Sequence, residues 1–170
     1  MNDFSVQKVN DGLRELEKKF SLDELDDWHT TAALVESAIA MLSSRVVGAK
    51  AWIFVHDPVA REYREINREG LASIPEDSLF IACLTMQNAG ISIKSFFKKY
   101  HLDDPFLRDL LSTSYRGQLL IPIVHRFSLL AFILLAVPNG VITDDCRRLV
   151  SSVASRLRIN LYAASIADRR

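Results

Sequence analysis

The side chains best suited to catalysis or metal binding in this sequence are its four histidines and two cysteines. No two histidines are spaced four residues apart, and no HExxH motif is present, so the helical zinc-binding pattern is absent. His56 and His125 both fall at the ends of expected strands, where turns could bring them together. Because two histidines without a third ligand rarely hold zinc, we expect exposed turn residues and no metal site.

The two cysteines, Cys83 and Cys146, are far apart and form no CxxC pair. Cys146 falls in the first turn of an expected helix, where the helix dipole favours a thiolate. It also lies on the apolar stripe of that helix, and Cys83 lies inside another apolar helix. Free cysteine is among the most frequently buried residues, so we expect both to be core side chains.

Sequence motifs of other enzyme classes are also missing. The chain has no GxSxG, GxxxxGK[ST] or GxGxxG motif and only six glycines, too few to suggest a glycine-rich phosphate cradle. Three pairs of acids fall at expected helix starts, where carboxylates stabilise the helix dipole: Asp26 and Asp27, Asp103 and Asp104, and Asp144 and Asp145. No set of nucleophile, base and metal ligand can be assembled, so we expect a protein that is not an enzyme.

Composition places the chain among globular proteins. Its 170 residues suit one domain, with 49% apolar and 25% charged residues. Lysine plus arginine equals aspartate plus glutamate at 21 each, without the basic excess that duplex binding requires, so we expect no nucleic-acid partner. The longest apolar run, Leu129–Val137, is too short to span a bilayer, and the first residues resemble no signal peptide. We therefore expect a cytoplasmic protein without membrane contact.

Hydrophobic periodicity predicts helices at both ends and strands between them. Apolar residues recur in steps of three and four over 6–20 and again over 25–46, where Ser21 and Glu24 have capping-box spacing. A last helix follows Thr143. The expected middle elements are a hairpin of 51–55 with 62–66, a helix over 76–87, a strand over 91–97, a short helix over 103–111, and strands over 118–124 and 129–137. Leu129–Val137 lacks alternation, so both of its faces should be covered.

These elements predict an α+β fold. We expect a central antiparallel sheet of about five or six strands, with the long terminal helices on one face and shorter helices on the other. The organisation is an N-terminal helix over residues 1–21, with a possible role in dimerisation or signalling, and a domain over residues 22–170.

The order of elements resembles the GAF domain family. The run Gln118–Val124, the strand Leu130–Leu135 and the acidic helix start at Asp144 are similar to its second half, and Ala51–Asp57 and Asn88–Ile93 to its first. The resemblance covers residues 22–168 and implies a GAF/PAS-like, cytoplasmic sensory or regulatory module, commonly dimeric. The NKxnFxxxDE signature and a bilin-attachment cysteine have no counterpart, so nucleotide or bilin binding is not implied, and no motif specifies a cofactor.

Two functional hypotheses follow from the resemblance. In the first, a signal-transduction domain binds a small, largely apolar molecule between the sheet and the helix over residues 79–87. Its candidate ligand-binding residues are Trp52, Phe54, Leu79, Cys83, Ile93, Ile121, Ile123 and Phe132. In the second, the domain serves dimerisation or protein docking without a ligand, because its own bulky side chains fill that space. The candidate filling residues are Phe80, Met86, Phe96, Phe97 and Tyr100.

The terminal helices are expected to form a homodimer that transmits a signal. An isolated helix as short as Val6–Phe20 is marginally stable, so its apolar stripe must pack on something. Asn160, on the stripe of the last helix, could set the register of a helix pair. The expected interface residues are Val6, Val9, Leu13, Leu16, Phe20, Leu157 and Asn160.

Overall fold

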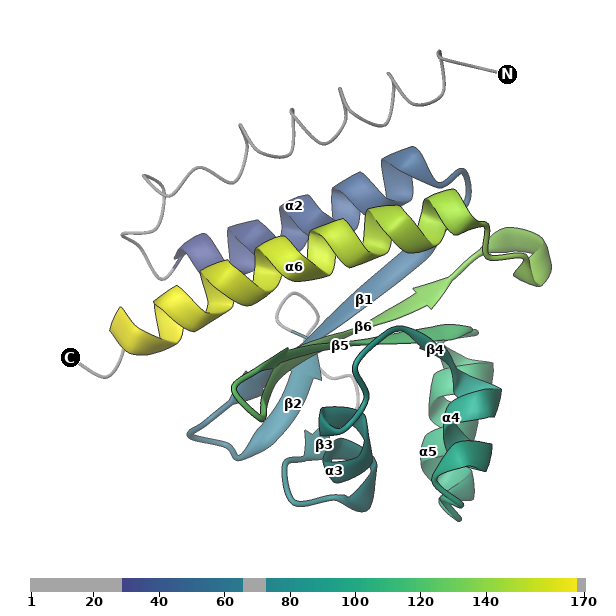
Figure 1. The fold of residues 1–170 in the computed structure, drawn as a ribbon, viewed down its shortest axis with the longest axis horizontal. Helices are drawn as coiled ribbons and strands as arrows, with labels where there is room; N and C mark the ends of the chain where they lie inside the picture. The colour runs from purple at the N-terminus through teal and green to yellow at the C-terminus, as the bar shows by residue number, and fades with distance from the viewer. Residues whose placement is uncertain (1–28, 66–72, 168–170) are drawn as a thin grey trace.

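A six-stranded antiparallel sheet lies between two layers of helices in the computed structural model (Figure 1). The structure describes residues 29–65 and 73–167. The strand order across the sheet is β3-β2-β1-β6-β5-β4. The strands are β1 (Lys50–Asp57), β2 (Glu62–Glu65), β3 (Ile74–Pro75), β4 (Ile91–Ser92), β5 (Leu119–His125) and β6 (Ser128–Ala136).

Strict alternation along the central strands separates two cores. In the antiparallel pair of β1 and β6, Phe54 lies opposite Phe132 and Ile53 lies opposite Ile133. Successive side chains of a strand point to opposite faces. The two phenylalanines therefore belong to one core, and the two isoleucines to the other. As predicted, both faces of the Leu129–Val137 run are covered: all but Leu130 and Ala136 are buried.

The first core lies under the two long helices, α2 (His29–Arg45) and α6 (Asp144–Ala167). Thr143 caps α6 as expected, because its Oγ1 accepts a hydrogen bond from the Cys146 backbone N–H at 3.2 Å. The two helices run antiparallel, so the start of α2 and the end of α6 lie at the same end of the molecule (Figure 1). Among the described residues, neither these helices nor any other is long and apolar enough to cross a membrane.

The second core lies under three short helices, α3 (Leu79–Thr85), α4 (Ile93–Lys99) and α5 (Pro105–Asp109). Each begins at a side-chain cap: Ser78 accepts from the Ile81 N–H, Ser92 from the Ser95 N–H, and Asp104 from the Leu107 N–H. The chain continues from α5 into a π-helical turn, Leu110–Ser114, and a 3₁₀ turn at Pro138–Gly140 follows β6. Local capping chemistry thus positions the layer that covers this face.

The strand expected over residues 91–97 is wrong for most of its length. Only Ile91 and Ser92 pair with β5, and α4 begins immediately afterwards at Ile93. The Ser92 hydroxyl accepts a hydrogen bond from the Ser95 N–H at 3.2 Å. This bond satisfies one of the backbone N–H groups that have no partner within the first turn of a helix. A capped helix then buries Phe96 and Phe97 on one side, which a strand would have placed on opposite faces.

The predicted fold class is confirmed: an antiparallel sheet carries the long helices on one face and the short helices on the other. The predicted helix over residues 6–20, the capping box at Ser21 and the domain boundary at residue 21 lie outside the described residues.

Candidate functional site

Aromatic side chains occupy the space between the sheet and the short helices. Phe132 lies at the centre, stacked on Phe54 with ring centroids 4.7 Å apart, and Phe80 of α3 meets it edge-on at 5.9 Å. Phe96 of α4 contacts Phe80 at 5.3 Å. We name this group the aromatic cluster; its members are Trp52, Phe54, Tyr63, Phe80, Phe96, Phe97, Tyr115 and Phe132, all buried. It fills the position at which the sequence predicted a ligand.

The predicted ligand-binding residues do not form one site. Trp52, Phe54, Cys83, Ile93 and Phe132 are brought together in the second core. Leu79, at the first position of α3, is 67% exposed. Ile121 and Ile123 lie in the first core, because alternation along β5 directs them toward the long helices. The prediction of a bound ligand stays a prediction.

The predicted filling residues divide in a similar way. Phe80, Phe96 and Phe97 are buried within the second core. Tyr100 is half-buried, and its hydroxyl donates a hydrogen bond to Gln87 Oε1 at 3.0 Å. Met86 follows the last residue of α3 and is 63% exposed, so it does not contribute.

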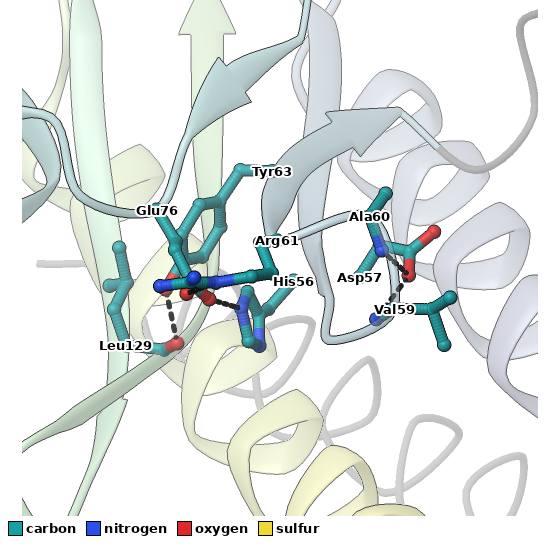
Figure 2. A network of polar contacts seen from close by, with 8 residues as sticks. All are labelled: His56, Asp57, Val59, Ala60, Arg61, Tyr63, Glu76 and Leu129. Carbon is teal, nitrogen blue, oxygen red and sulfur yellow. Dashed lines mark hydrogen bonds and ion pairs between the residues drawn. The ribbon is translucent and has the colours of Figure 1, made fainter.

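A polar network lies at one end of this face, where β1 meets the turn before α3. Glu76 accepts from His56 Nε2 at 2.7 Å through one carboxylate oxygen and from Arg61 Nε at 2.5 Å through the other (Figure 2). The Glu76 backbone N–H also donates to the Arg61 carbonyl at 3.0 Å. These bonds join the β1–β2 turn to the start of the short-helix layer.

Tyr63 connects this network to the sheet. Its hydroxyl donates to the Leu129 carbonyl at 2.7 Å, and its ring lies 5.0 Å from the His56 ring (Figure 2). Burial raises the pKa of Tyr63 to about 12, with a smaller contribution from the Glu76 charge. The phenol therefore stays neutral and serves as a structural donor.

Hydrogen bonds and charged neighbours stabilise the two carboxylates of this end. Hydrogen bonds from Arg61 and then His56 lower the pKa of Glu76, despite an opposing effect of desolvation. The backbone N–H groups of Ala60 and Val59 both donate to Asp57 Oδ1 (Figure 2). The Ala60 bond is the largest cause of the lowered pKa of Asp57, and Arg64 pairs with the same side chain.

The histidines have separate partners. His56 bonds to Glu76, whereas the His125 ring stacks on Tyr162 of α6 at 3.8 Å. Within residues 29–65 and 73–167, no three His, Cys, Asp or Glu side chains are grouped in a way that could hold a metal ion. The pair of His56 and Glu76 can orient a turn and share a proton.

Both cysteines are buried, as predicted. Burial raises the pKa of the Cys83 thiol. It also raises the pKa of Cys146, against a smaller lowering by Arg147. Because the thiolate is the reactive form, neither residue is poised for thiol chemistry at neutral pH.

The predicted interface residues of α6 lie inside the protomer. Leu157 is fully buried in the first core, and Asn160 is only 4% exposed. The stripe to which they belong faces the sheet of its own chain, so neither offers a surface to a partner. The other predicted interface residues, Val6, Val9, Leu13, Leu16 and Phe20, lie outside the described residues.

Sequence reasoning missed the roles of Glu76, Arg61 and Tyr63. His56-Asp57-Pro58 indicated the turn, but nothing in the local sequence paired His56 with a residue twenty positions later. Arg61 adopts a positive φ of 57°, which no glycine or asparagine signalled. The cross-strand position of Tyr63 opposite His56 was the one available signal, because facing residues of a hairpin contact each other.

Solved structures share this arrangement of sheet and helices. A GAF domain from a phosphoenolpyruvate-protein phosphotransferase of Coxiella burnetii is 15% identical, with a TM-score of 0.63 over 95% of this chain and 97% of that one. The GAF domain of the potassium sensor histidine kinase KdpD from Escherichia coli is 11% identical, with a TM-score of 0.56 over 93% and 96%. A free methionine-R-sulfoxide reductase from Neisseria meningitidis is 12% identical, with a TM-score of 0.61 over 98% and 96%.

The chain has a GAF-like fold, as its element order suggested. No protein-family model and no curated protein matches the sequence. At these identities the structural likeness establishes the fold, and function has to be argued from the site.

Proposed function

We propose that this chain is a non-catalytic regulatory domain of a signal-transduction system that acts through protein contacts of its terminal helices. Its short-helix face is closed by its own side chains rather than by a ligand. The observation that supports this choice is the aromatic cluster, in which Phe54, Phe96 and Phe132 are completely buried among the side chains of the chain itself. The GAF domain of a sensor histidine kinase shares the fold and is consistent with such a role.

Under the small-molecule hypothesis, side chains of the aromatic cluster would have to move to admit a ligand. A ligand between the sheet and α3 would have to displace Phe80, which contacts both Phe132 and Phe96. Opening a packed core costs the dispersion contacts of every ring that moves. The docking hypothesis requires no such rearrangement, and we therefore favour it.

The absence of an enzymatic role is proposed on the chemistry of the described groups. The thiols of Cys83 and Cys146 have raised pKa values, and the phenol of Tyr63 is engaged with a carbonyl. Glu76 is hydrogen-bonded to both His56 and Arg61. The two thiols are thus buried, and the phenol, the imidazole and the carboxylate are engaged in hydrogen bonds within the fold.

The output is proposed to pass through a homodimer. The start of α2 and the end of α6 lie at one end of the molecule, so a segment attached to either can meet its symmetry mate there (Figure 1). The apolar residues Val6, Val9, Leu13, Leu16 and Phe20 precede α2 and recur at the spacing of a helix pair. Pairing of these stripes would turn a small rotation of α2 or α6 into a signal.

Light scattering on the full chain tests this proposal. We expect the mass of a dimer at micromolar concentration, and a monomer for the double variant Leu13→Glu and Leu16→Glu. The matched control is Lys18→Glu, which makes the same change of two charge units in the same segment off the stripe and should leave the dimer intact. A monomeric parent chain, or a dimer unaffected by the stripe variant, would contradict the proposal.

A further inference from the structure

The outward face of α6 carries a second stripe of residues in steps of three and four. The buried stripe of this helix includes Val150, Val153 and Leu157. On the opposite side of the helix, Ile159 is 51% exposed and Ile166 is 41% exposed. The outward stripe consists of Ser152, Ser155, Ile159, Tyr162 and Ile166, and its C-terminal half is apolar. A helix that exposes apolar residues at this spacing is suited to receive another helix.

The β5–β6 hairpin adjoins the apolar half of this stripe. The His125 ring stacks on the Tyr162 ring with centroids 3.8 Å apart, at an interplanar angle of 30°. The Arg126 guanidinium lies 6.0 Å from the centroid of the same Tyr162 ring. These contacts hold the Tyr162 side chain of α6 against the β5–β6 hairpin, so the helix and the hairpin form one surface.

The tip of this hairpin exposes an aromatic ring at a strained position. Arg126 and Phe127 have φ values of 46° and 67°, in the left-handed region that asparagine and glycine usually occupy in a two-residue hairpin turn. Phe127 is nevertheless 96% exposed, so its ring contributes almost nothing to the core of its own chain. A strained residue that the fold does not use for packing is a reason to look for a binding role.

The same surface carries an excess of positive charge. From Ile159 to Ala167, beside the apolar half of the outward stripe, α6 has no aspartate or glutamate. Arg126 and Arg158 are both exposed. The acids of the neighbouring β1–β2 hairpin, Asp57 and Glu62, are already paired with Arg64. In a chain of zero net charge, this arrangement favours an acidic partner.

We propose that Phe127, Arg126 and the outward stripe of α6 form a docking surface for an acidic amphipathic helix of another protein. The apolar side of that helix would cover Ile159, Tyr162 and Ile166, with Phe127 as an aromatic anchor at the edge. Its flanking carboxylates would face Arg126 and Arg158. A second copy of the same face would instead bring arginines against arginines. The inference goes beyond the proposed homodimer, which is built on residues 6–20.

Fluorescence anisotropy with a labelled synthetic peptide tests the proposal on the full chain. The probe has leucines at steps of three and four and glutamates on both flanking faces, and the comparison peptide has lysine in place of every glutamate. We expect saturable binding of the glutamate peptide only, weakened by raising the salt concentration. Phe127→Gly and Ile159→Ser should each weaken binding at least about tenfold, as expected for an anchor residue. Arg158→Glu should weaken binding and reduce its salt dependence.

Two controls separate binding from folding. Glycine tolerates the positive φ at position 127, so Phe127→Gly should melt no lower than the parent chain while binding less. Val47→Ser changes a valine that is 89% exposed in the turn between α2 and β1, and it should leave binding unchanged. Peptide binding is measured separately from the oligomeric state. If the Leu13→Glu and Leu16→Glu variant does not alter the oligomer, only the proposed homodimer is refuted, and the docking surface is not.

Three results would overturn the proposed docking surface. The first is that the glutamate peptide does not bind at all, the second is that the lysine peptide binds equally well, and the third is that both Phe127→Gly and Ile159→Ser retain full affinity. If those two variants instead convert a dimer to a monomer in light scattering, the occupant is a second copy and the acidic partner is refuted.

Discussion

Phe54 and Phe132 stack face to face across the central strand pair, with ring centroids 4.7 Å apart and an interplanar angle of 4°. They are direct cross-strand partners in the antiparallel pairing of β1 with β6. Both are completely buried, and Phe132 also contacts Phe80 and Tyr63. This pair is the centre of the aromatic cluster that closes the short-helix face.

Removal of the Phe132 ring should therefore destabilise the protein strongly. We expect Phe132→Ala to reduce the free energy of unfolding by about 3–5 kcal/mol, from lost burial and the cavity left behind. Urea denaturation followed by circular dichroism measures this change. Phe127→Ala, at a ring that is 96% exposed, is the matched control and should change stability by less than about 0.5 kcal/mol. Equal effects of the two substitutions would show that the cluster does not support the fold.

The hydroxyl of Tyr63 should contribute a measurable hydrogen bond. Tyr63→Phe leaves the Leu129 carbonyl without this donor, and we expect a loss of about 1 kcal/mol. The raised pKa of about 12 also sets the alkaline behaviour. The folded protein retains a proton that the unfolded chain loses near its ordinary pKa of 10.0, so stability falls between these values as pH rises. Tyr63→Phe should make that alkaline loss smaller, as measured by urea titrations at each pH.

Glu76 should make stability fall in acid. Its pKa is lowered from the ordinary value of 4.5 by Arg61 and His56, so the folded protein binds this proton less readily than the unfolded chain does. The contribution is present above that ordinary value and is lost as pH falls through the lowered pKa. Glu76→Gln should flatten the acid limb of the curve of unfolding free energy against pH. Glu36→Gln, on the exposed side of α2, is the control; a limb unchanged by Glu76→Gln would count against the network.

Gly117 should not tolerate a side chain. A Cβ at this position would lie 2.3 Å from Leu134 Cδ1 and 2.8 Å from the Leu111 carbonyl oxygen, so the core has to shift. We expect Gly117→Ala to cost about 1–3 kcal/mol of unfolding free energy. At Gly90 the nearest atom to an added Cβ is Ile121 Cγ1 at 3.3 Å, and Gly90→Ala should cost clearly less. Thermal unfolding of the two variants side by side decides the comparison.

Much of the fold was predictable because local patterns and tertiary packing agree. The uninterrupted apolar run over 129–137 indicated a strand covered on both faces, and β6 is that strand. Thr143 acts as the helix cap that its residue type suggested, and Asp104, expected near a helix start, caps α5. The strand over 91–97 failed because Ser92 caps a helix, and a short apolar run does not distinguish a strand from a helix by itself.

The candidate site was less predictable because it depends on which face each residue occupies. The alternation of β5 decides that Ile121 faces the long helices while Leu120 faces the aromatic cluster, and a shift of one residue would exchange them. The stripe of α6 that contains Leu157 and Asn160 is the apolar one in sequence, so it turns inward. The weaker stripe with Ile159 and Ile166 is the one left outside. The pairing of Glu76 with His56 arises from tertiary contact and has no local signal.

The central claim is that the short-helix face is closed by its own side chains and that the module acts through protein contacts. Native mass spectrometry of the full chain, purified without added ligand, tests it most directly. We predict a species at twice the 19.2 kDa chain mass, with no additional mass retained under gentle ionisation. A discrete small molecule bound to the parent chain and lost on Phe80→Trp, which enlarges a side chain inside the cluster, would contradict the account.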